Sequence, residues 1–395
     1  MNPAAPGMAL SPLDDQRLHQ ALVLAREAIG LSDPNPRVGC VLGRADGEVL
    51  GTGFTQQAGG PHAEVMALRD ALALGQDARG TTAWVTLEPC AHHGSTPPCC
   101  DALIAAGITR VVVAVVDPHV KVAGRGIQRL RDSGVVVEVA EGAIAAAARD
   151  LNVGFFARCE RGRPWVRLKA AASLDGRTAL PDGTSQWITG TPARADGHGW
   201  RKRAGALLTG IGTALRDDPR LDVRHVPTTL QPLRVIVDSG MRLPPGARLL
   251  APPGKVLLVT ATDETGPRAH ALRVAGAEIL VLAGADGRVD LPALMQELGR
   301  RGVNELHVEA GAALNGALLG LQLVDELLLY LAPMFVGSGR GIADLPAALQ
   351  LSDCPRFEVH EMHRVGEDIR LRLRRNTVGQ LDTIQLGDCA TRVSS

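Results

Sequence analysis

Residues 111–116 read Val111-Val112-Val113-Ala114-Val115-Val116, six apolar residues in succession. An apolar run without polar alternation predicts a strand that is buried on both faces of a sheet. The apolar residues on either side of this run are spaced as in helices, which we expect over 98–106 and 127–132. Strands and helices in alternation predict an α/β domain, in which helices cover both faces of the sheet.

The same alternation continues in both directions along the chain. In the first 150 residues, further helices are expected over 14–30, 62–74 and 143–150, and further strands over 38–42, 49–54, 82–87 and 135–139. The turn Ala45-Asp46-Gly47 predicts that two of these strands form a hairpin. Later strands are expected over 166–171, 206–209, 235–238, 256–260, 278–282, 305–308 and 326–331, helices over 192–203, 291–300 and 312–319, and a final hairpin of 357–363 with 369–373.

The length of the chain, 395 residues, is too great for one average domain and favours two. Residues 158–164 are charged and then contain Gly and Pro, so we expect a linker there. The predicted organisation is therefore an N-terminal tail over 1–13, a first α/β domain over 14–158, a second over 164–375 and a C-terminal tail over 376–395.

Composition excludes several classes of protein. Lys and Arg number 42 and Asp and Glu also 42, and no basic run is longer than Arg201-Lys202-Arg203, so nucleic acid is not expected as a partner. The longest uncharged stretch, 310–324, is shorter than the roughly 20 apolar residues of a membrane helix, and no membrane association is expected. The start has no secretory signal, which predicts a cytoplasmic protein. Three of the seven cysteines fall within eleven residues, a pattern that indicates metal or redox chemistry in a reducing compartment.

The strongest chemical motif combines His62-Ala63-Glu64 with Pro89-Cys90, 28 residues after the histidine, and with Cys99, nine residues later. Catalytic zinc takes three protein ligands and keeps its fourth position for a water, whose pKa it lowers to about 7. Residues two apart do not share a helix face, so Glu64 is expected to reach that water as a proton carrier while His62 binds the metal. Histidine-x-glutamate followed by proline-cysteine is the signature of zinc deaminases, although the spacing between the two cysteines is longer here. The sequence thus predicts one zinc ion per chain.

Alternatives remain open at this site. Cys100 could replace Cys99, and His92 or His93 could act as a ligand. A purely structural zinc would usually have four Cys or His ligands and would leave Glu64 without a task.

The run from Val85 to Cys100, Val-Thr-Leu-Glu-Pro-Cys-Ala-His-His-Gly-Ser-Thr-Pro-Pro-Cys-Cys, resembles a known family. In that family a diaminohydroxyphosphoribosylaminopyrimidine deaminase is joined to a 5-amino-6-(5-phosphoribosylamino)uracil reductase of riboflavin biosynthesis. Further segments agree in order over roughly residues 14–375: 34–39, 117–118, 122–126, 169–178, 185–189, 217–219 and 309–311.

The resemblance implies a cytidine-deaminase-like α/β/α domain followed by a dihydrofolate-reductase-like α/β domain. It implies that the first domain hydrolyses the 2-amino group of a phosphorylated pyrimidinone, and that the second reduces the ribosyl chain to ribityl with NADPH. The zinc ligands of the family fall on His62, Cys90 and Cys99, and its proton donor falls on Glu64. Two positions depart from the family: Thr55 stands where histidine is common, and His119-Val120 replaces Asn-Pro, so substrate contacts there are expected to differ.

The resemblance also implies binding residues in the second domain. NADPH contacts fall on Ala171, Trp187, Thr213, Asp217, Ser239, Gly311, Ala312, Ala313, Leu314, Asn315, Gly316 and Ala317. Substrate contacts fall on Ser185, Arg201, Leu221, Arg224 and Glu309. A helix that begins after Gly311 offers N–H groups to a phosphate, and two arginines suit a ribose phosphate.

Other features of the second half carry less information. Gly210-Ile211-Gly212-Thr213-Ala214-Leu215 lacks the third glycine of a dinucleotide-binding turn, so a simple turn from strand to helix is the better interpretation. The segment 337–341 is either a phosphate-binding nest or an ordinary loop. Asp175, Lys169 and Glu309 are the candidates for the acid of the reductase.

We therefore predict a two-domain enzyme that acts on a small phosphorylated pyrimidine, and the sequence allows a homo-oligomer. A deaminase of nucleic-acid bases would need a basic groove and stacking aromatic residues, but the first 150 residues are net acidic and aromatic residues make up 3% of the chain. A non-catalytic zinc-binding scaffold would have no use for Glu64.

Overall fold

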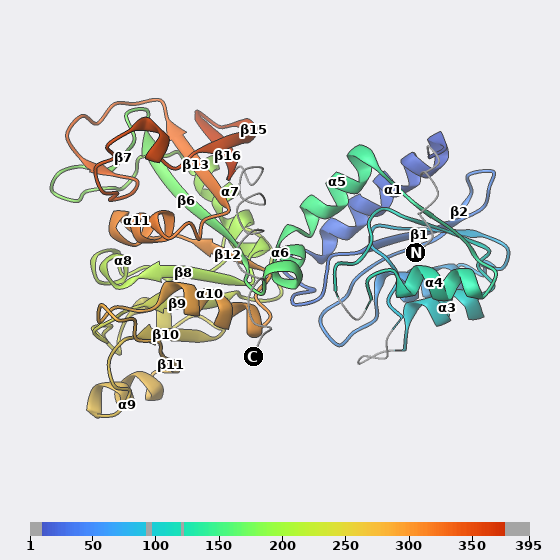
Figure 1. The fold of residues 1–395 in the computed structure, drawn as a ribbon, viewed down its shortest axis with the longest axis horizontal. Coiled ribbons are helices and arrows are strands. Elements are labelled where there is room, and N and C mark those ends of the chain that lie inside the picture. The colour runs from blue at the N-terminus through green and yellow to red at the C-terminus, as the bar shows by residue number, and fades with distance from the viewer. Residues whose placement is uncertain (1–9, 92–96, 120–121, 376–395) are drawn as a thin grey trace, which may run out of the picture. The chain divides into compact units, whose positions relative to one another are not determined.

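The computed structural model describes residues 10–91, 97–119 and 122–375 (Figure 1). The chain divides into two compact units: the first comprises Met1–Trp165 with Gly197–His307, and the second comprises Val166–Asp196 with Val308–Ser395. Residues 1–9 of the expected N-terminal tail and all of the expected C-terminal tail lie outside the described residues.

A five-stranded sheet forms around the valine-rich stretch in the first unit (Figure 1). Its strands lie in the order β2 (Val49–Phe54), β1 (Gly39–Gly43), β3 (Thr82–Val85), β4 (Arg110–Val113) and β5 (Val136–Val139). Strand β1 is antiparallel to both neighbours, and β3, β4 and β5 are parallel. Because β4 lies inside the sheet, both of its faces are buried, as predicted.

Helices cover both faces of this sheet, which confirms the predicted α/β architecture. On one face, Val41, Trp84 and Val112 pack against side chains of α1 and α5. On the other face, Val111 and Val113 pack against side chains of α2, α3 and α4. The helices have the bounds α1 Pro12–Ala25, α2 Ala63–Ala73, α3 Cys99–Ala105, α4 Arg125–Asp132 and α5 Gly142–Leu151.

The first unit also contains parallel strands from the second half of the sequence. Strands β11 (Ala277–Val281), β10 (Val256–Thr260), β9 (Leu233–Val237) and β8 (Ala206–Gly210) pair in that order, and β12 (Glu305–Val308) and α10 (Leu291–Arg300) follow β11 in sequence. In the second unit, β6 (Trp165–Ser173) is parallel to β13 (Glu326–Ala332), β13 is antiparallel to β16 (Asp368–Arg375), and β16 forms the predicted hairpin with β15 (Phe357–Val365). Helices α7 (Thr191–Arg203) and α11 (Ala312–Gly320) form as expected.

Several elements differ from the prediction. Residues 158–161 of the expected linker belong to helix α6 (Val153–Arg161), which ends at Gly162 with a φ of +70°. The side chains of Phe155 and Phe156 are buried in the core of the first sheet, and this tertiary contact holds the segment helical. Besides α6, three elements were not predicted: helix α9 (Pro267–Val274) and the short antiparallel strands β7 (Arg177–Ala179) and β14 (Arg340–Gly341). Helix α8 (Ile211–Asp217) is the helix that follows the expected turn from strand to helix. Short 3₁₀ helices cover Arg26–Ala28, which lies inside the first predicted helix, Arg248–Leu250 and Leu351–Asp353.

A buried ion cluster crosses the sheet of the second unit. Arg167 Nε lies 2.5 Å from Glu326 Oε1, and neither side chain is exposed to solvent. Arg372 and Arg374 contact the other carboxylate oxygen of Glu326. Glu326 therefore contacts several guanidinium groups, and Glu361 Oε2 lies 2.7 Å from Nη1 of one of them, Arg372.

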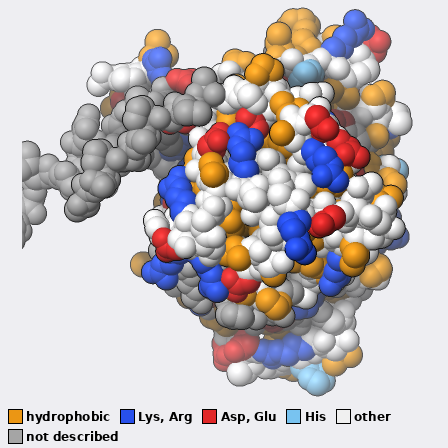
Figure 2. Space-filling view, turned by 90° about the vertical axis from the view of Figure 1, so that its right-hand side faces the viewer, with side chains coloured by type: hydrophobic (Ala, Val, Ile, Leu, Met, Phe, Trp, Pro, Cys, Tyr) orange, Lys and Arg blue, Asp and Glu red, His pale blue; other side chains and the backbone are white. Residues whose placement is uncertain are grey.

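On the face drawn in Figure 2, basic and acidic side chains of the described residues are interspersed, and neither sign gathers into one patch. None of the described helices combines the length and the apolar character that crossing a bilayer requires.

Candidate functional sites

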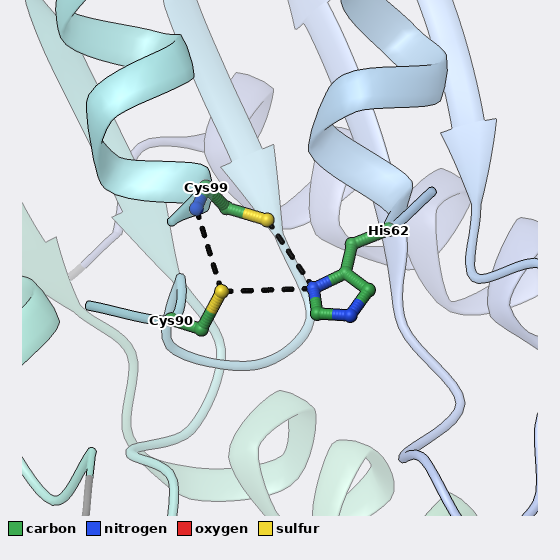
Figure 3. Close-up of side chains that lie close together, drawn as sticks. All are labelled: His62, Cys90 and Cys99. Atoms are coloured by element: carbon green, nitrogen blue, oxygen red, sulfur yellow. Dashed lines mark hydrogen bonds between the residues drawn. The ribbon is translucent and has the colours of Figure 1, made fainter. Parts of the chain in front are cut away.

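Three potential metal ligands come from the ends of three elements (Figure 3). His62 has an extended backbone and precedes the first residue of α2. Cys90 lies in the segment that follows β3, and Cys99 is the first residue of α3, directly after Pro98. His62 and Cys99 are thus fixed at the starts of two helices, and Cys90 lies in the segment between β3 and α3.

The donor atoms of these residues converge. His62 Nδ1 lies 3.6 Å from Cys90 Sγ and 3.3 Å from Cys99 Sγ, and all three ligand atoms lie within 4.8 Å of one another. The backbone N–H of Cys99 also donates to Cys90 Sγ at 3.4 Å. Two sulfurs and one imidazole nitrogen are a ligand set that catalytic zinc uses, so the residues fit the predicted metal.

The surroundings of Cys90 favour ionisation of its thiol. Hydrogen bonds from Cys99 and from His62 lower the pKa of the Cys90 thiol below its usual range. This favours the thiolate, which is the form of cysteine that binds metals.

Glu64 lies in the first turn of α2, two residues after His62, and is only 3% exposed. Burial, followed by the negative charge of Cys90, raises the pKa of Glu64 to about 7. A carboxyl group that gives and takes protons near neutrality suits proton transfer.

The structure decides between the two adjacent cysteines. Cys100 is buried and its thiol donates to the carbonyl oxygens of Pro89, at 3.2 Å, and Gly126, at 3.5 Å. Cys99, and not Cys100, therefore meets His62. His92 and His93 lie outside the described residues.

Sequence reasoning missed the role of Glu88. Its buried carboxylate accepts hydrogen bonds from the backbone N–H groups of Asp117, Gly124, Gly126 and Ile127, at 2.9–3.2 Å. The N-cap residue of helix α4 is Gly124, which has no side chain to cap the helix. The carboxylate of Glu88 accepts from N–H groups of the first turn instead. A glutamate directly before Pro89-Cys90, together with a helix start that lacks a capping residue, is the signal that could have identified it.

Of the two departures from the family, Thr55 and His119 lie among the described residues, whereas Val120 lies outside them. Thr55 is buried: its N–H donates to Val38 O at 3.0 Å, and its hydroxyl accepts from Val38 N at 3.2 Å. The N–H of His119 donates to Asp117 Oδ1 at 2.7 Å, and burial raises the pKa of Asp117 to about 7.

Among the candidate reductase residues of the first unit, Arg201, Leu221 and Arg224 gather around Asp222. Arg201 Nη1 donates to the carbonyl oxygen of Asp222 at 2.9 Å, and Arg224 Nη1 lies 2.8 Å from Asp222 Oδ1. Leu221 is buried with a φ of +47°. Two further candidates, Thr213 and Asp217, lie on α8, and Ser239 follows β9, where its hydroxyl accepts from Val289 N at 3.1 Å.

The remaining candidates belong to the second unit. Ala171 lies on β6, Ser185 and Trp187 precede α7, and Glu309 follows β12. The indole of Trp187 is 66% exposed, with the guanidinium of Arg194 4.3 Å from the ring centroid.

Residues Ala312–Ala317 lie on α11, whose N-cap residue is Gly311, a glycine without a side chain to cap the helix. The amide of Asn315 donates to Ile342 O at 2.8 Å, and a Cβ at Gly316 would lie 1.9 Å from Asp344 O. These two residues therefore hold the segment 342–344 against the helix.

The structure also describes the two glycine-containing segments, 337–341 and 210–215. The carboxylate of Asp175 accepts hydrogen bonds from the Ser173 hydroxyl, from Val336 N at 3.1 Å and from Gly337 N at 2.7 Å. The bond from Ser173, followed by these backbone bonds, lowers the pKa of Asp175 to about 2. Gly337 N is therefore already used by Asp175, and 340–341 form β14, so this segment is an ordinary loop and strand. The segment 210–215 is a turn from β8 into α8.

Comparison with known proteins identifies both halves of the chain. A family model described as the cytidine and deoxycytidylate deaminase zinc-binding region matches residues 12–115, and one described as the RibD C-terminal domain matches residues 164–371.

Similar proteins match along almost the whole length. The chain is 43% identical to the riboflavin biosynthesis protein RibD of Escherichia coli (strain K12), over 91% of this chain and 99% of that protein. The solved structure of Acinetobacter baumannii RibD, form 1, is 40% identical with a TM-score of 0.83, and covers 92% of this chain and 99% of its own. A diaminohydroxyphosphoribosylaminopyrimidine deaminase/5-amino-6-(5-phosphoribosylamino)uracil reductase from Thermotoga maritima is 31% identical with a TM-score of 0.81, over 92% and 99% of the two chains. The chain therefore belongs to the RibD family and is a bifunctional deaminase and reductase of riboflavin biosynthesis.

Proposed function

We propose that the first half of the chain hydrolyses the 2-amino group of 2,5-diamino-6-(5-phosphoribosylamino)pyrimidin-4(3H)-one. The second half then reduces the ribosyl chain of 5-amino-6-(5-phosphoribosylamino)uracil to ribityl with NADPH. The observation that carries the first step is the convergence of His62 Nδ1 with the two sulfurs of Cys90 and Cys99 beside a buried Glu64.

In this proposal His62, Cys90 and Cys99 hold one zinc ion per chain. Zinc, when bound, supplies an acidified water at neutral pH. Glu64 carries protons: its carboxyl group takes a proton from the incoming water and gives it to the departing nitrogen, which leaves as ammonia. The burial of Glu64 excludes bulk water as a competing proton acceptor.

For the reductase, we propose that NADPH contacts Ala171, Trp187, Thr213, Asp217, Ser239, Gly311, Ala312, Ala313, Leu314, Asn315, Gly316 and Ala317. We propose that the substrate contacts Ser185, Arg201, Leu221, Arg224 and Glu309. Two observations support these roles. The N-cap residue of α11 is a glycine, and the N–H groups of a helix start suit a phosphate. Arg201 and Arg224 both contact Asp222, and guanidinium groups suit a ribose phosphate.

We further propose that the two activities reside in residues 14–158 and 164–375, and that the enzyme works in the cytoplasm on small phosphorylated pyrimidines, without nucleic-acid or membrane partners. Free thiols at Cys40, Cys159 and Cys354 suit a reducing compartment. We also propose that the chain forms a homo-oligomer, and sedimentation measures its mass in solution.

The test is incubation of the purified chain with the diaminopyrimidinone ribosyl phosphate, followed by mass spectrometry. Without NADPH we expect a gain of about 1 Da, from the exchange of NH for O. With NADPH we expect a further gain of about 2 Da, from reduction. An unchanged substrate in both arms would contradict the proposal, and a gain with NADH but not with NADPH would overturn the cofactor assignment.

A further inference from the structure

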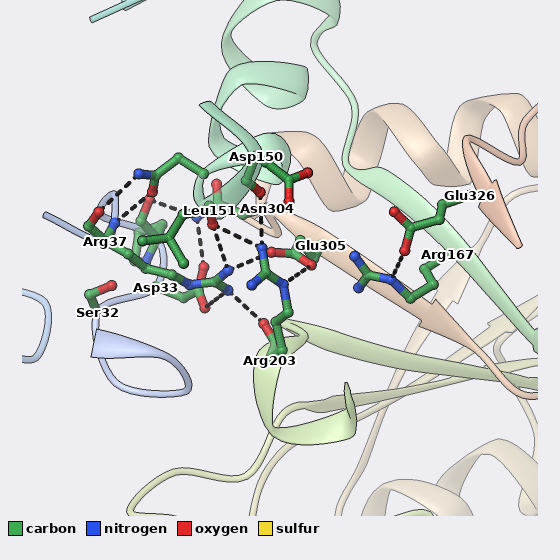
Figure 4. Close-up of polar contacts among 12 residues, drawn as sticks. Ser32, Asp33, Arg37, Asp150, Leu151, Arg167, Arg203, Asn304, Glu305 and Glu326 are labelled. Carbon is green, nitrogen blue, oxygen red and sulfur yellow. Dashed lines mark hydrogen bonds and ion pairs between the residues drawn. The ribbon is translucent and has the colours of Figure 1, made fainter. Parts of the chain in front are cut away.

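A buried polar network in the first unit joins the segment 33–37, which precedes β1, to the start of β12 (Figure 4). Arg37 is 3% exposed and Glu305 is 1% exposed, and Arg37 Nη1 lies 2.6 Å from Glu305 Oε1. Arg203 Nε lies 2.9 Å from the other oxygen of Glu305. Arg37 lies in the range matched by the deaminase family, whereas Glu305 and Arg203 lie in the range matched by the RibD C-terminal domain.

The same network fixes the backbone of the segment. The N–H of Arg37 donates to Asn152 Oδ1 at 2.7 Å, and Asn152 Nδ2 donates to Arg37 O at 2.9 Å. Asn304 Nδ2 donates to Asp33 Oδ1 at 2.7 Å and to Pro34 O at 3.1 Å. Two adjacent residues at the start of β12 therefore hold both ends of the segment: Asn304 binds Asp33 and Glu305 binds Arg37.

The segment continues directly into the framework of the metal centre. Val38 exchanges hydrogen bonds with Thr55, which lies seven residues before His62. Gly39 N donates to Thr86 Oγ1 at 3.0 Å and Gly39 O accepts from Thr86 N at 3.1 Å, and Thr86 lies four residues before Cys90. The residues that follow Arg37 thus brace the strands leading to two of the three candidate ligands.

Packing around the network leaves little room for the segment to shift. A Cβ added to Gly154 would lie 2.5 Å from Asn304 O, and one added to Gly302 would lie 3.0 Å from Pro34 Cβ. A displacement at Glu305 would therefore be transmitted through tightly packed atoms and would not be absorbed locally.

We propose that Glu305, from the range that carries the reductase, is a positioning residue for deamination. It neutralises Arg37 and, through Arg37, holds the segment that braces the approaches to His62 and Cys90. Arg37 also lies 3.6 Å from Asp33 Oδ2, so removal of the charge of Glu305 takes away the closer of these two carboxylates. The loss of this buried partner favours movement of the segment towards water. This role of Glu305 rests on the proposed zinc site, whose geometry it would hold through Arg37.

The test compares Glu305→Gln with Glu326→Gln in the full chain. The two changes are matched: each removes one charge from a fully buried glutamate that contacts two or more arginines, but Glu326 contacts arginines of the second unit. Zinc content, deamination and reduction are measured for both variants well below the melting temperature. We expect E305Q to lower kcat/KM for deamination about ten- to a hundredfold, with a smaller loss in reduction, since misplaced groups cost rates of this order. We expect E326Q to leave deamination within about twofold.

A second pair keeps the proposal testable if E305Q does not fold. Arg37→Lys retains the charge but not the guanidinium fork that reaches Glu305, Leu151 O and Arg203 O, and Arg167→Lys is its control in the second unit. We expect R37K to lower deamination at least fivefold more than reduction. In a double-mutant cycle, R37K and E305Q should be non-additive for deamination.

Equal losses of deamination in E305Q and E326Q, or additive effects of R37K and E305Q, would overturn the positioning role. These outcomes differ from a failure of the proposed site. If Glu64→Gln retained full deamination, the site would be wrong, whereas an inactive E64Q beside a fully active E305Q would refute only the inference about Glu305.

Discussion

Glu64 and His62 lie two residues apart at the start of α2, yet they are assigned different tasks. Replacement of Glu64 by Gln keeps the size of the side chain and removes its ability to take a proton. We expect Glu64→Gln to lower kcat for deamination by about 100- to 10,000-fold, because this is the usual contribution of a positioned acid or base. Reduction by the same chain serves as the control and should not change, and zinc content measured by atomic absorption should remain at one per chain. Loss of zinc from this variant would show that Glu64 is a ligand.

The adjacent cysteines allow a matched comparison. Cys99 Sγ faces His62, whereas the thiol of Cys100 donates to Pro89 O and Gly126 O. We expect Cys99→Ser to lose zinc and deamination together, since the thiolate ligand is gone. Cys100→Ser keeps a hydrogen-bond donor of similar size and should retain zinc and most of the activity. Zinc released per chain, titrated with a chromogenic chelator, decides the matter, and equal retention by both variants would contradict the ligand set.

Which site residues a sequence reveals depends on whether their role is local. The prediction of His62, Glu64, Cys90 and Cys99 rests on residue types and spacings that follow from zinc chemistry, and the structure brings His62, Cys90 and Cys99 together. Glu88 was not, because its partners lie 29 to 39 residues later and are backbone N–H groups, which leave no trace in side-chain patterns. The choice between Cys99 and Cys100 also needed the structure, since the sequence places both at the start of a helix.

At the scale of elements, helix α4 depends on a residue that lies outside it. Glu88 accepts hydrogen bonds from N–H groups at and before the start of this helix, and Glu88→Gln would set an amide NH₂ against them. We expect this change to lower the free energy of unfolding by about 2–3 kcal/mol, since hydrogen bonds to a buried charge are strong.

The same change should also raise KM for deamination, because the segment after β4 loosens. The control is Asp101→Asn, which breaks a partly exposed pair with Arg129 and should cost at most about 1 kcal/mol. Urea unfolding measures both variants, and an unfolding midpoint for E88Q equal to that of D101N would contradict this role.

Most strands of the first sheet and the helices that cover it were predictable from the spacing of apolar residues. Burial on one face makes apolar residues recur at a regular spacing, and burial on both faces makes a continuous apolar run. The bounds of β2, β10, α10 and β12 are those predicted. Helix α6 was missed because its segment ends in charged residues and Gly, and only its contact with the core of the first sheet shows that Phe155 and Phe156 form a buried helical face. Strands β7 and β14 are too short to show a period, and they form because they pair with each other.

At the scale of the whole molecule, the first unit draws on both halves of the sequence, and Gly154 lies where they pack together. A methyl group there would meet Asn304 O at 2.5 Å. We expect Gly154→Ala to lower stability by about 1–3 kcal/mol, the usual cost of overpacking. Gly199→Ala is the matched control: it also lies within a helix, its Cβ meets nothing within 4 Å, and it should be neutral or stabilising by up to about 1 kcal/mol. Thermal melting of both variants is the measurement, and a Tm for G154A at or above that of G199A would contradict the close approach.

Arg37 has partners in the second half of the sequence, and this matters for expression of the deaminase half of the chain alone. A truncated version that stops near residue 162 would keep Arg37 but lose both Glu305 and the carbonyl of Arg203. In such a fragment Arg37 would keep the carboxylate of Asp33, 3.6 Å away, but not the closer one of Glu305. The surface around Gly154 would be newly exposed to solvent, and the fragment should aggregate or be degraded in the host. A fragment in which Arg37 is replaced by a neutral side chain should be easier to express, because it no longer needs Glu305.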